Sequence, residues 1–161
     1  MITRYIVGDI TETELKYIAH GVNCQNVMGS GVAKALFTKW LDVKTEYHKF
    51  CALVAQTPEE RLGSAEPVHV EDGKVIYNMF TQLNYGYDNK KYVNYAATSN
   101  CFRLLITDGV KQIAIPKIGC GLAGGNWAFM EQLINDTVGD KVEIWVYELN
   151  TTNFSGKNDA A

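Results

Sequence analysis

The stretch Ile115-Pro-Lys-Ile-Gly-Cys-Gly-Leu-Ala-Gly-Gly-Asn-Trp127 holds the features that decide the fold. It continues from Gln112–Ile115, a short apolar run with β-branched residues that is typical of a buried central strand. Glycines then follow at positions 119, 121, 124 and 125. Glycines at this spacing let backbone N–H groups approach a ligand without interference from Cβ atoms. The pattern predicts a strand that runs directly into a glycine-rich loop.

A helix is predicted to begin where this loop ends. Asn126 is a good N-cap residue, and Trp127, Met130, Ile134 and Val138 then fall on one helical face. A glycine loop that opens into a helix N-terminus offers free N–H groups and a positive dipole end to an anion. A plain tight connection between strand and helix is the alternative interpretation.

The same arrangement occurs earlier in the chain. Residues 17–22 form a second apolar strand pattern, and residues 23–31 form a polar loop with Gly29 and Gly31. After this loop, apolar residues at helical spacing predict a helix: Val32, Leu36, Phe37 and Trp40. In parallel sheets ligands bind outside the carboxyl ends of the strands, so both loops are expected at one edge. Two facing glycine loops suit an elongated anion such as a diphosphate.

The remaining segments predict an α/β layered fold with a mostly parallel sheet. The first and last strands are predicted at Ile2–Val7 and at residues 142–147. A hairpin is predicted at residues 65–70 and 75–81. Further helices are indicated around Val43 to Val54 and around Tyr95 to Ile106, with a polar loop at residues 83–91 before the second of them. We expect one domain over residues 1–150 and a flexible polar tail over residues 151–161.

Composition narrows the function classes. With a net charge of −3, the 161-residue chain is not expected to bind nucleic acid or membranes. No apolar run approaches the roughly 18 residues of a membrane span, and the N-terminus does not resemble a signal peptide. Four widely spaced cysteines indicate reduced thiols rather than a metal site or disulfides. We therefore expect a cytoplasmic monomer without a metal or cofactor.

The chain resembles a macrodomain, the ADP-ribose-binding three-layer α/β/α fold with a mixed, mostly parallel central sheet. The resemblance covers roughly residues 2–149. It is carried by Val7-Gly8-Asp9-Ile10, by Ala19-His20-Gly21-Val22-Asn23 leading to Met28-Gly29-Ser30-Gly31-Val32-Ala33, and by Pro116-Lys117-Ile118-Gly119-Cys120-Gly121-Leu122. It is greatest to the branch that holds the yeast-type ADP-ribose 1″-phosphate phosphatase and the terminal ADP-ribose glycohydrolase.

The resemblance implies a role for each ligand-binding motif. Asp9 would accept from the adenine amino group, Ile10 would offer its N–H to a ring nitrogen, and Tyr147 or Asn150 would stack on the base. Asn23 would bind the distal ribose. The remaining implied contacts are Gly8 beside Asp9, and phosphate or ribose contacts from Met28, Gly29, Ser30, Gly31, Val32, Ile118, Gly119, Cys120, Gly121, Leu122 and Ala123. Alternatively, Asp9 caps the next segment, Asn23 forms a turn and Tyr147 belongs to the core.

The sequence lacks several of the charged catalytic residues of the proteins it resembles, although it keeps their binding motifs. Glycohydrolase relatives carry a lysine and an aspartate where this chain has Gln82 and Ala123, so their lysine-based mechanism is expected to be absent. Phosphatase-like relatives have aspartate before the tryptophan, where this chain has Asn126. A missing acid–base group typically costs about 10²- to 10⁴-fold in rate. Cys120 offers a thiol near a helix N-terminus, with space filling as the simpler interpretation.

Asn23, Asn126 and His20 are the catalytic candidates, as residues that would place an attacking water. Strand alternation favours a structural role for His20, because Ile18, His20 and Val22 share one face and Asn23 falls on the other. The leading hypothesis is hydrolysis of the phosphate of ADP-ribose 1″-phosphate. The alternative is a non-catalytic binder of ADP-ribose or a related NAD-derived nucleotide, and a glycohydrolase acting on ADP-ribosylated protein is the least favoured.

Overall fold

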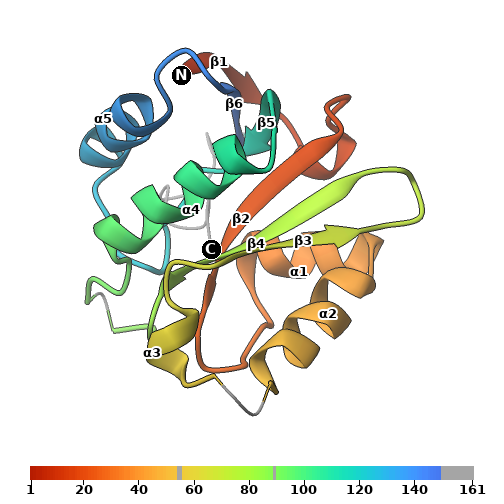
Figure 1. Ribbon diagram of the computed structural model, residues 1–161, viewed down its shortest axis with the longest axis vertical. Helices are drawn as coiled ribbons and strands as arrows, with labels where there is room; N and C mark the ends of the chain where they lie inside the picture. Colours follow the sequence, from red (N-terminus) through yellow and green to blue (C-terminus); the bar gives the residue numbers. More distant parts are fainter. Residues whose placement is uncertain (54–55, 89, 150–161) are drawn as a thin grey trace.

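A computed structural model describes residues 1–53, 56–88 and 90–149, and it contains a six-stranded sheet in the order β1-β6-β5-β2-β4-β3 (Figure 1). Among the described strands, only β3 runs antiparallel to its neighbour, β4. The strands are β1 (Ile2–Val7), β2 (Tyr17–Asn23), β3 (Ala65–His69), β4 (Val75–Gln82), β5 (Gln112–Ile115) and β6 (Glu143–Glu148).

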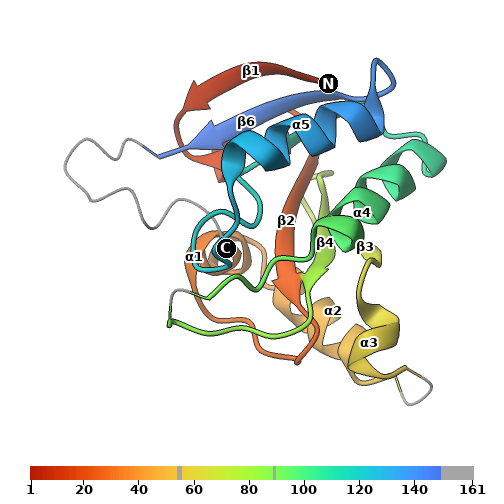
Figure 2. The same cartoon turned by 90° about the vertical axis from the view of Figure 1, so that its left-hand side faces the viewer.

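Helices cover both faces of this sheet (Figures 1 and 2). One layer contains α1 and α2, and the opposite layer contains α4 and α5, so the molecule has three layers. The helices are the 3₁₀ turn η1 (Ile10–Glu12), α1 (Gly31–Lys39), α2 (Asp42–Cys51), α3 (Pro58–Arg61), α4 (Tyr95–Thr107) and α5 (Trp127–Val138).

The core follows from the composition of the central strands. Every residue of β4 is buried, and β2 is buried from Ile18 to Val22, as expected for strands covered on both faces. Leu36, Val43 and Tyr47 fill one side of the sheet, whereas Phe102, Leu105, Met130 and Ile134 fill the other. The sheet is therefore a rigid support for the loops at its edges.

The predicted fold class is confirmed: the structure is an α/β/α sandwich on a mixed, mostly parallel sheet. The predicted hairpin at residues 65–81 and the N-cap at Asn126 are also present, the latter accepting from the Phe129 N–H at 2.9 Å. The short helix α3, which a Thr57–Glu60 capping box begins, was not among the predicted elements. Val54, Asn150 and the predicted tail at residues 151–161 lie outside the described residues.

Parallel pairing brings the carboxyl ends of β2 and β4 together. His20 pairs with Asn78 and Asn23 with Gln82, and the register shifts between Val22 and Asn23. Figure 2 shows the two arrowheads directed at the same edge, where the segments after each strand run. None of the helices in the described part of the chain is long and apolar enough to cross a bilayer.

Candidate functional site

Two pockets lie at the carboxyl edge of the sheet. The central pocket, of about 190 Å³, lies at the ends of β2 and β4. The edge pocket, of about 270 Å³, lies beside the ends of β1 and β6. The central pocket is lined by Gly21, Val22, Asn23, Val27, Met28, Gly29, Ser30, Ala33, Gln82, Tyr85, Gly86, Tyr87 and Leu122. The edge pocket is lined by Gly8, Asp9, Ile10, Gly31, Val32, Ala35, Pro116, Tyr147, Glu148 and Leu149.

The start of α1 separates the two pockets and contributes to both. Gly29 and Ser30 line the central pocket, whereas Gly31 and Val32 line the edge pocket. Leu122, from the other glycine loop, also lines the central pocket. Residues from both glycine loops therefore line the central pocket.

The N-terminus of α1 is free to receive an anion. Its first backbone bond runs from Lys34 N to Ser30 O, at 3.4 Å. Within the described residues, the N–H groups of Gly31, Val32 and Ala33 have no acceptor in the protein. Free N–H groups and the positive end of a nine-residue helix together make this point the natural place for a phosphate.

The loop after β5 contributes less to the pockets than the sequence predicts. Gly119 needs its glycine, because it has φ +77° and a Cβ there would lie 2.5 Å from the Val93 side chain. The Cys120 N–H donates to Lys117 O at 3.2 Å, so it is already engaged. Ile118 and Ala123 are buried in the core. Leu122 of the predicted phosphate cradle lines the central pocket. The other predicted cradle residues of this loop line neither pocket: Ile118, Gly119, Cys120, Gly121 and Ala123.

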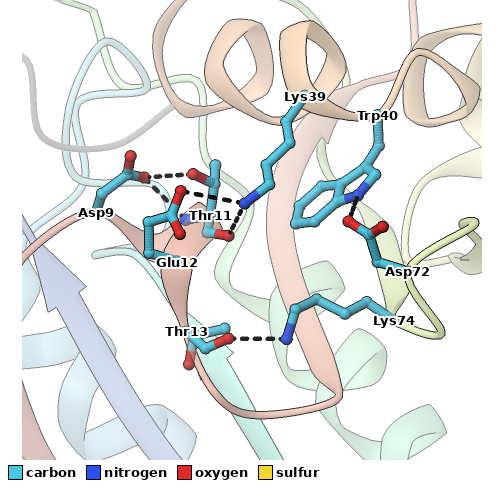
Figure 3. Close-up of polar contacts among 8 residues, drawn as sticks. All are labelled: Asp9, Thr11, Glu12, Thr13, Lys39, Trp40, Asp72 and Lys74. Atoms are coloured by element: carbon cyan, nitrogen blue, oxygen red, sulfur yellow. Dashed lines mark hydrogen bonds and ion pairs between the residues drawn. The ribbon is translucent and has the colours of Figure 1, made fainter.

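Asp9 in the edge pocket has one carboxylate oxygen in use and one available. Its Oδ1 accepts from the Thr11 N–H at 2.9 Å and from the Thr11 hydroxyl at 2.8 Å, which caps η1 (Figure 3). Lys39 fixes the same segment by donating to Thr11 O and to Glu12 Oε1. Asp9 thus caps η1, as the alternative interpretation held, while its Oδ2 accepts no hydrogen bond from the described residues and Asp9 still lines the edge pocket.

Tyr147 closes the inner side of the edge pocket. It is 8% exposed, and its hydroxyl lies 2.7 Å from the Thr13 hydroxyl. Lys74 holds Thr13 in turn by donating to its carbonyl at 2.8 Å (Figure 3). Tyr147 is therefore both a core residue and a pocket wall. The adjacent Ile10 is buried, and the Gly8 N–H donates to Glu148 O.

Asn23 is held firmly in the central pocket. Its Oδ1 accepts from the Gln25 N–H and lies 2.9 Å from the Tyr47 hydroxyl, while its Nδ2 donates to Val27 O at 2.7 Å. These contacts leave one Nδ2 hydrogen for a ligand. Asn23 also forms the turn that the alternative interpretation expected. Gln82, its partner across the sheet, lines the same pocket and donates to Asn84 O.

The other two catalytic candidates lie outside both pockets. His20 is fully buried, and burial lowers the pKa of its imidazole to about 4. Asn126 is exposed at the start of α5, where its Oδ1 is occupied as the helix cap. The expectation that His20 and Asn23 face opposite sides fails at the end of β2. Asn23 accepts from the Tyr47 hydroxyl of α2, and Asn78, the hydrogen-bond partner of His20, donates to Val43 O of the same helix, so both side chains lie toward that layer.

Sequence reasoning did not identify Tyr85, Gly86 and Tyr87, which form one wall of the central pocket. They lie in the segment between β4 and α4, which was treated only as a polar connection. Two tyrosines around a glycine, directly after a buried strand, are the signal that could have found them. Loops at the carboxyl ends of parallel strands are where ligands bind, so aromatic residues there point to recognition.

The central pocket contains little acid–base chemistry. Apart from its two tyrosines, no lining residue in the described part of the chain is ionisable. Burial also raises the pKa of the nearby Cys120 thiol to about 11, which disfavours the nucleophilic thiolate. The described residues contain no cluster of His, Cys, Asp and Glu suited to a metal ion. The arrangement is suited to holding an anion by neutral donors.

Known proteins are similar to this chain in sequence and in fold. The chain is 33% identical to an uncharacterized 17.5 kDa protein of Enterobacteria phage T4, over 92% of this chain and 97% of that one. It is 26% identical to human ADP-ribose glycohydrolase OARD1, over 90% of each chain. It is also 26% identical to the DNA ADP-ribosyl glycohydrolase of Thermus aquaticus, over 90% of this chain but only 41% of that protein.

A solved structure of a protein of unknown function from Bacteroides thetaiotaomicron superposes with a TM-score of 0.81 at 30% identity. That superposition covers 92% of this chain and 98% of the other. The Macro domain family matches residues 19–134, which include most of β2, both glycine loops and most of α5. The chain therefore belongs to the Macro domain family.

Proposed function

We propose that the protein binds ADP-ribose, with adenosine in the edge pocket, the diphosphate at the N-terminus of α1 and the distal ribose in the central pocket. The observation that carries this is the free helix N-terminus between two pockets at one sheet edge. Together the two pockets fall within the roughly 300–1,000 Å³ typical of ligand sites. The names of the human and Thermus aquaticus relatives point to the same nucleotide.

The edge pocket supplies the groups that would recognise adenine. Asp9 Oδ2 can accept from the exocyclic amino group, since Oδ1 alone serves as the cap. Tyr147 offers an aromatic surface that its contact with Thr13 holds in place. No cation lines this pocket in the described part of the chain, so the base is held by a hydrogen bond and an aromatic contact.

Calorimetric titration with ADP-ribose tests the binding proposal, with Asp9→Asn as the informative variant. Asparagine caps a helix about as well as aspartate, so the fold is preserved. It replaces the free acceptor by an N–H₂ donor that repels the adenine amino group. We expect the affinity to fall by about 10- to 100-fold, the value of a hydrogen bond to a charged group.

Asp136→Asn is the matched control, because Asp136 is exposed on α5 and lines neither pocket. It should bind ADP-ribose as the parent does. Absence of binding by the folded parent protein would refute the proposal. Equal affinity in the parent and in Asp9→Asn would refute the placement of adenine in the edge pocket.

A second candidate function is removal of the terminal phosphate from ADP-ribose 1″-phosphate. Water would attack phosphorus, the bond between phosphorus and the ribose oxygen would break, and inorganic phosphate and ADP-ribose would leave. The unused Nδ2 hydrogen of Asn23 supports this candidate, because it can hold a phosphate oxygen or the attacking water. No general base lines the central pocket among the described residues, so turnover is expected to be slow.

Phosphate release from ADP-ribose 1″-phosphate distinguishes this candidate from binding alone. Slow release that falls further in Asn23→Ala would support it. Release at the buffer background by folded, ADP-ribose-binding protein would remove the phosphatase and leave the binding proposal intact. Glycohydrolysis is the weaker alternative despite the names of the relatives, because the Gln82 amide in this pocket is a poor nucleophile.

A further inference from the structure

The segment between β4 and α4 is a built part of the central pocket. A bridge between Gln82 and Val93 brings its two ends together. The N–H groups of Tyr92 and Val93 both donate to Ala123 O, at 2.7 and 3.1 Å, which joins the segment to the second glycine loop. The base of the segment is therefore anchored to β4 on one side and to the loop after β5 on the other.

A second set of contacts fixes the part that carries the pocket wall. Gly86 packs so closely on the Tyr92 ring that any Cβ would overlap it. The Tyr92 hydroxyl donates to Asp88 Oδ1 at 2.7 Å, and Asp88 also accepts from the Lys90 N–H. Because its neighbours on both sides are held, Tyr87 has a defined position at the mouth of the pocket.

Tyr87 reaches across the pocket to the opposite wall. Its hydroxyl oxygen lies 3.4 Å from Ser30 Oγ, at the outer limit of a hydrogen bond. Ser30 occupies the N-cap position of α1, yet its hydroxyl makes no capping bond. The Ser30 hydroxyl is thus available on the pocket side, where it meets Tyr87. The Tyr87 ring is 71% exposed, so burial of the ring does not account for its position.

We propose that Tyr87 and Ser30 form a strap across the central pocket. The strap favours ADP-ribose whose distal ribose carries only a small group. It disfavours ADP-ribose that is attached to a peptide through that ribose. This inference rests on the proposed binding function and specifies the ligand class of the same site. A hydroxyl or a phosphate fits beneath the strap, whereas a peptide has to displace Tyr87. Selectivity then comes from steric exclusion rather than from added attraction.

The test compares the affinity of two ligands, ADP-ribose and a short peptide carrying one ADP-ribosylated serine. The parent is expected to bind free ADP-ribose at least about tenfold more tightly, which corresponds to about 1.4 kcal/mol. In Tyr87→Ala the ratio should fall below about threefold, through tighter binding of the peptide. Tyr87→Phe keeps the ring but loses the hydroxyl that meets Ser30, so its ratio should lie between those of the parent and of Tyr87→Ala.

Phe129→Ala is the control, because Phe129 is another exposed aromatic residue but lines neither pocket. It should leave the ratio unchanged. Equal affinity of the parent for both ligands, or an unchanged ratio in folded Tyr87→Ala, overturns the strap while ADP-ribose binding stands. Failure of the parent to bind ADP-ribose overturns the strap and the proposed function together.

Discussion

The same two strands, β2 and β4, build two polar clusters a few residues apart, and these differ in charge and in access. The inner cluster contains His20 of β2 and Asn78 of β4, together with Glu66 of the adjacent β3. The outer pair, Asn23 and Gln82, faces the central pocket. His20 and Glu66, the ionisable side chains of the inner cluster, thus line neither pocket, whereas Asn23 and Gln82 are neutral. This contrast favours ligand binding over acid–base catalysis at the end of these strands.

The inner cluster has one consistent proton arrangement. Asn78 Nδ2 donates to Val43 O and to Glu66 Oε1, both at 3.2 Å, so its Oδ1 is the acceptor. His20 Nε2, 2.5 Å from that oxygen, must then carry the proton. His20 Nδ1 is buried without a partner among the described residues. The histidine is therefore held neutral and acts as a structural donor.

The largest expected effect comes from placing a charge in the outer pair. Asn23→Asp keeps the size of the side chain but puts a carboxylate beside the proposed distal ribose and diphosphate. Like charges in a desolvated site cost several kcal/mol, so ADP-ribose affinity should fall by about 100-fold. Asn26→Asp adds the same charge three residues away, outside both pockets, and should bind nearly as the parent does. Equal losses in both variants would contradict a neutral pocket.

The next effect is on the pH dependence of folding stability, to which His20 and Glu66 of the inner cluster contribute with opposite signs. Burial lowers the pKa of His20 to about 4, so the unfolded chain binds more protons below its ordinary pKa of 6.5. Stability from His20 is therefore present above pH 6.5 and is lost as the pH falls toward 4. Burial raises the pKa of Glu66 to about 7. Its contribution is present below pH 4.5 and is lost as the pH rises toward 7.

These opposite slopes should partly cancel in the parent between pH 5 and 7, and single variants should reveal each of them. Glu66→Gln leaves the histidine slope, so chemical denaturation should show about 2 kcal/mol more stability at pH 7 than at pH 5. His20→Gln leaves the glutamate slope, with the opposite sign and a smaller size because Glu66 is partly solvated. Slopes of the same sign in both variants would show that the groups do not titrate independently.

A smaller effect is expected from a cation in the outer pair. Gln82→Lys places an amine in the central pocket, where a charge-assisted bond to a terminal phosphate becomes available. Affinity for ADP-ribose 1″-phosphate should rise by about tenfold, and affinity for ADP-ribose should rise less. Gln132→Lys on α5 adds the same charge outside the pockets and should change neither. An unchanged preference in Gln82→Lys would show that the terminal group lies elsewhere.

The two clusters also show how far sequence reasoning reaches. Periodicity and glycine spacing located β2, β5, α1 and α5, because burial and backbone geometry act on neighbouring residues. Strand alternation suggested a structural His20, and the buried position of its ring agrees with that interpretation. The partners of His20 and the wall at Tyr87 depend on pairing between distant segments. The orientation of Asn23 depends on its contact with Tyr47 of α2, which no strand pattern indicates.

The smallest expected effect lies between the two clusters, at Thr81. Thr81 is the extra residue of β4 where the register shifts, and its buried hydroxyl has no partner among the described residues. An unpaired buried hydroxyl costs stability, and valine has nearly the same shape with high β propensity. Thr81→Val should therefore raise the free energy of unfolding by up to about 1 kcal/mol, measured by denaturant titration, with ADP-ribose affinity unchanged. A loss of stability would contradict an unpaired hydroxyl at Thr81 and would mean that a water satisfies it.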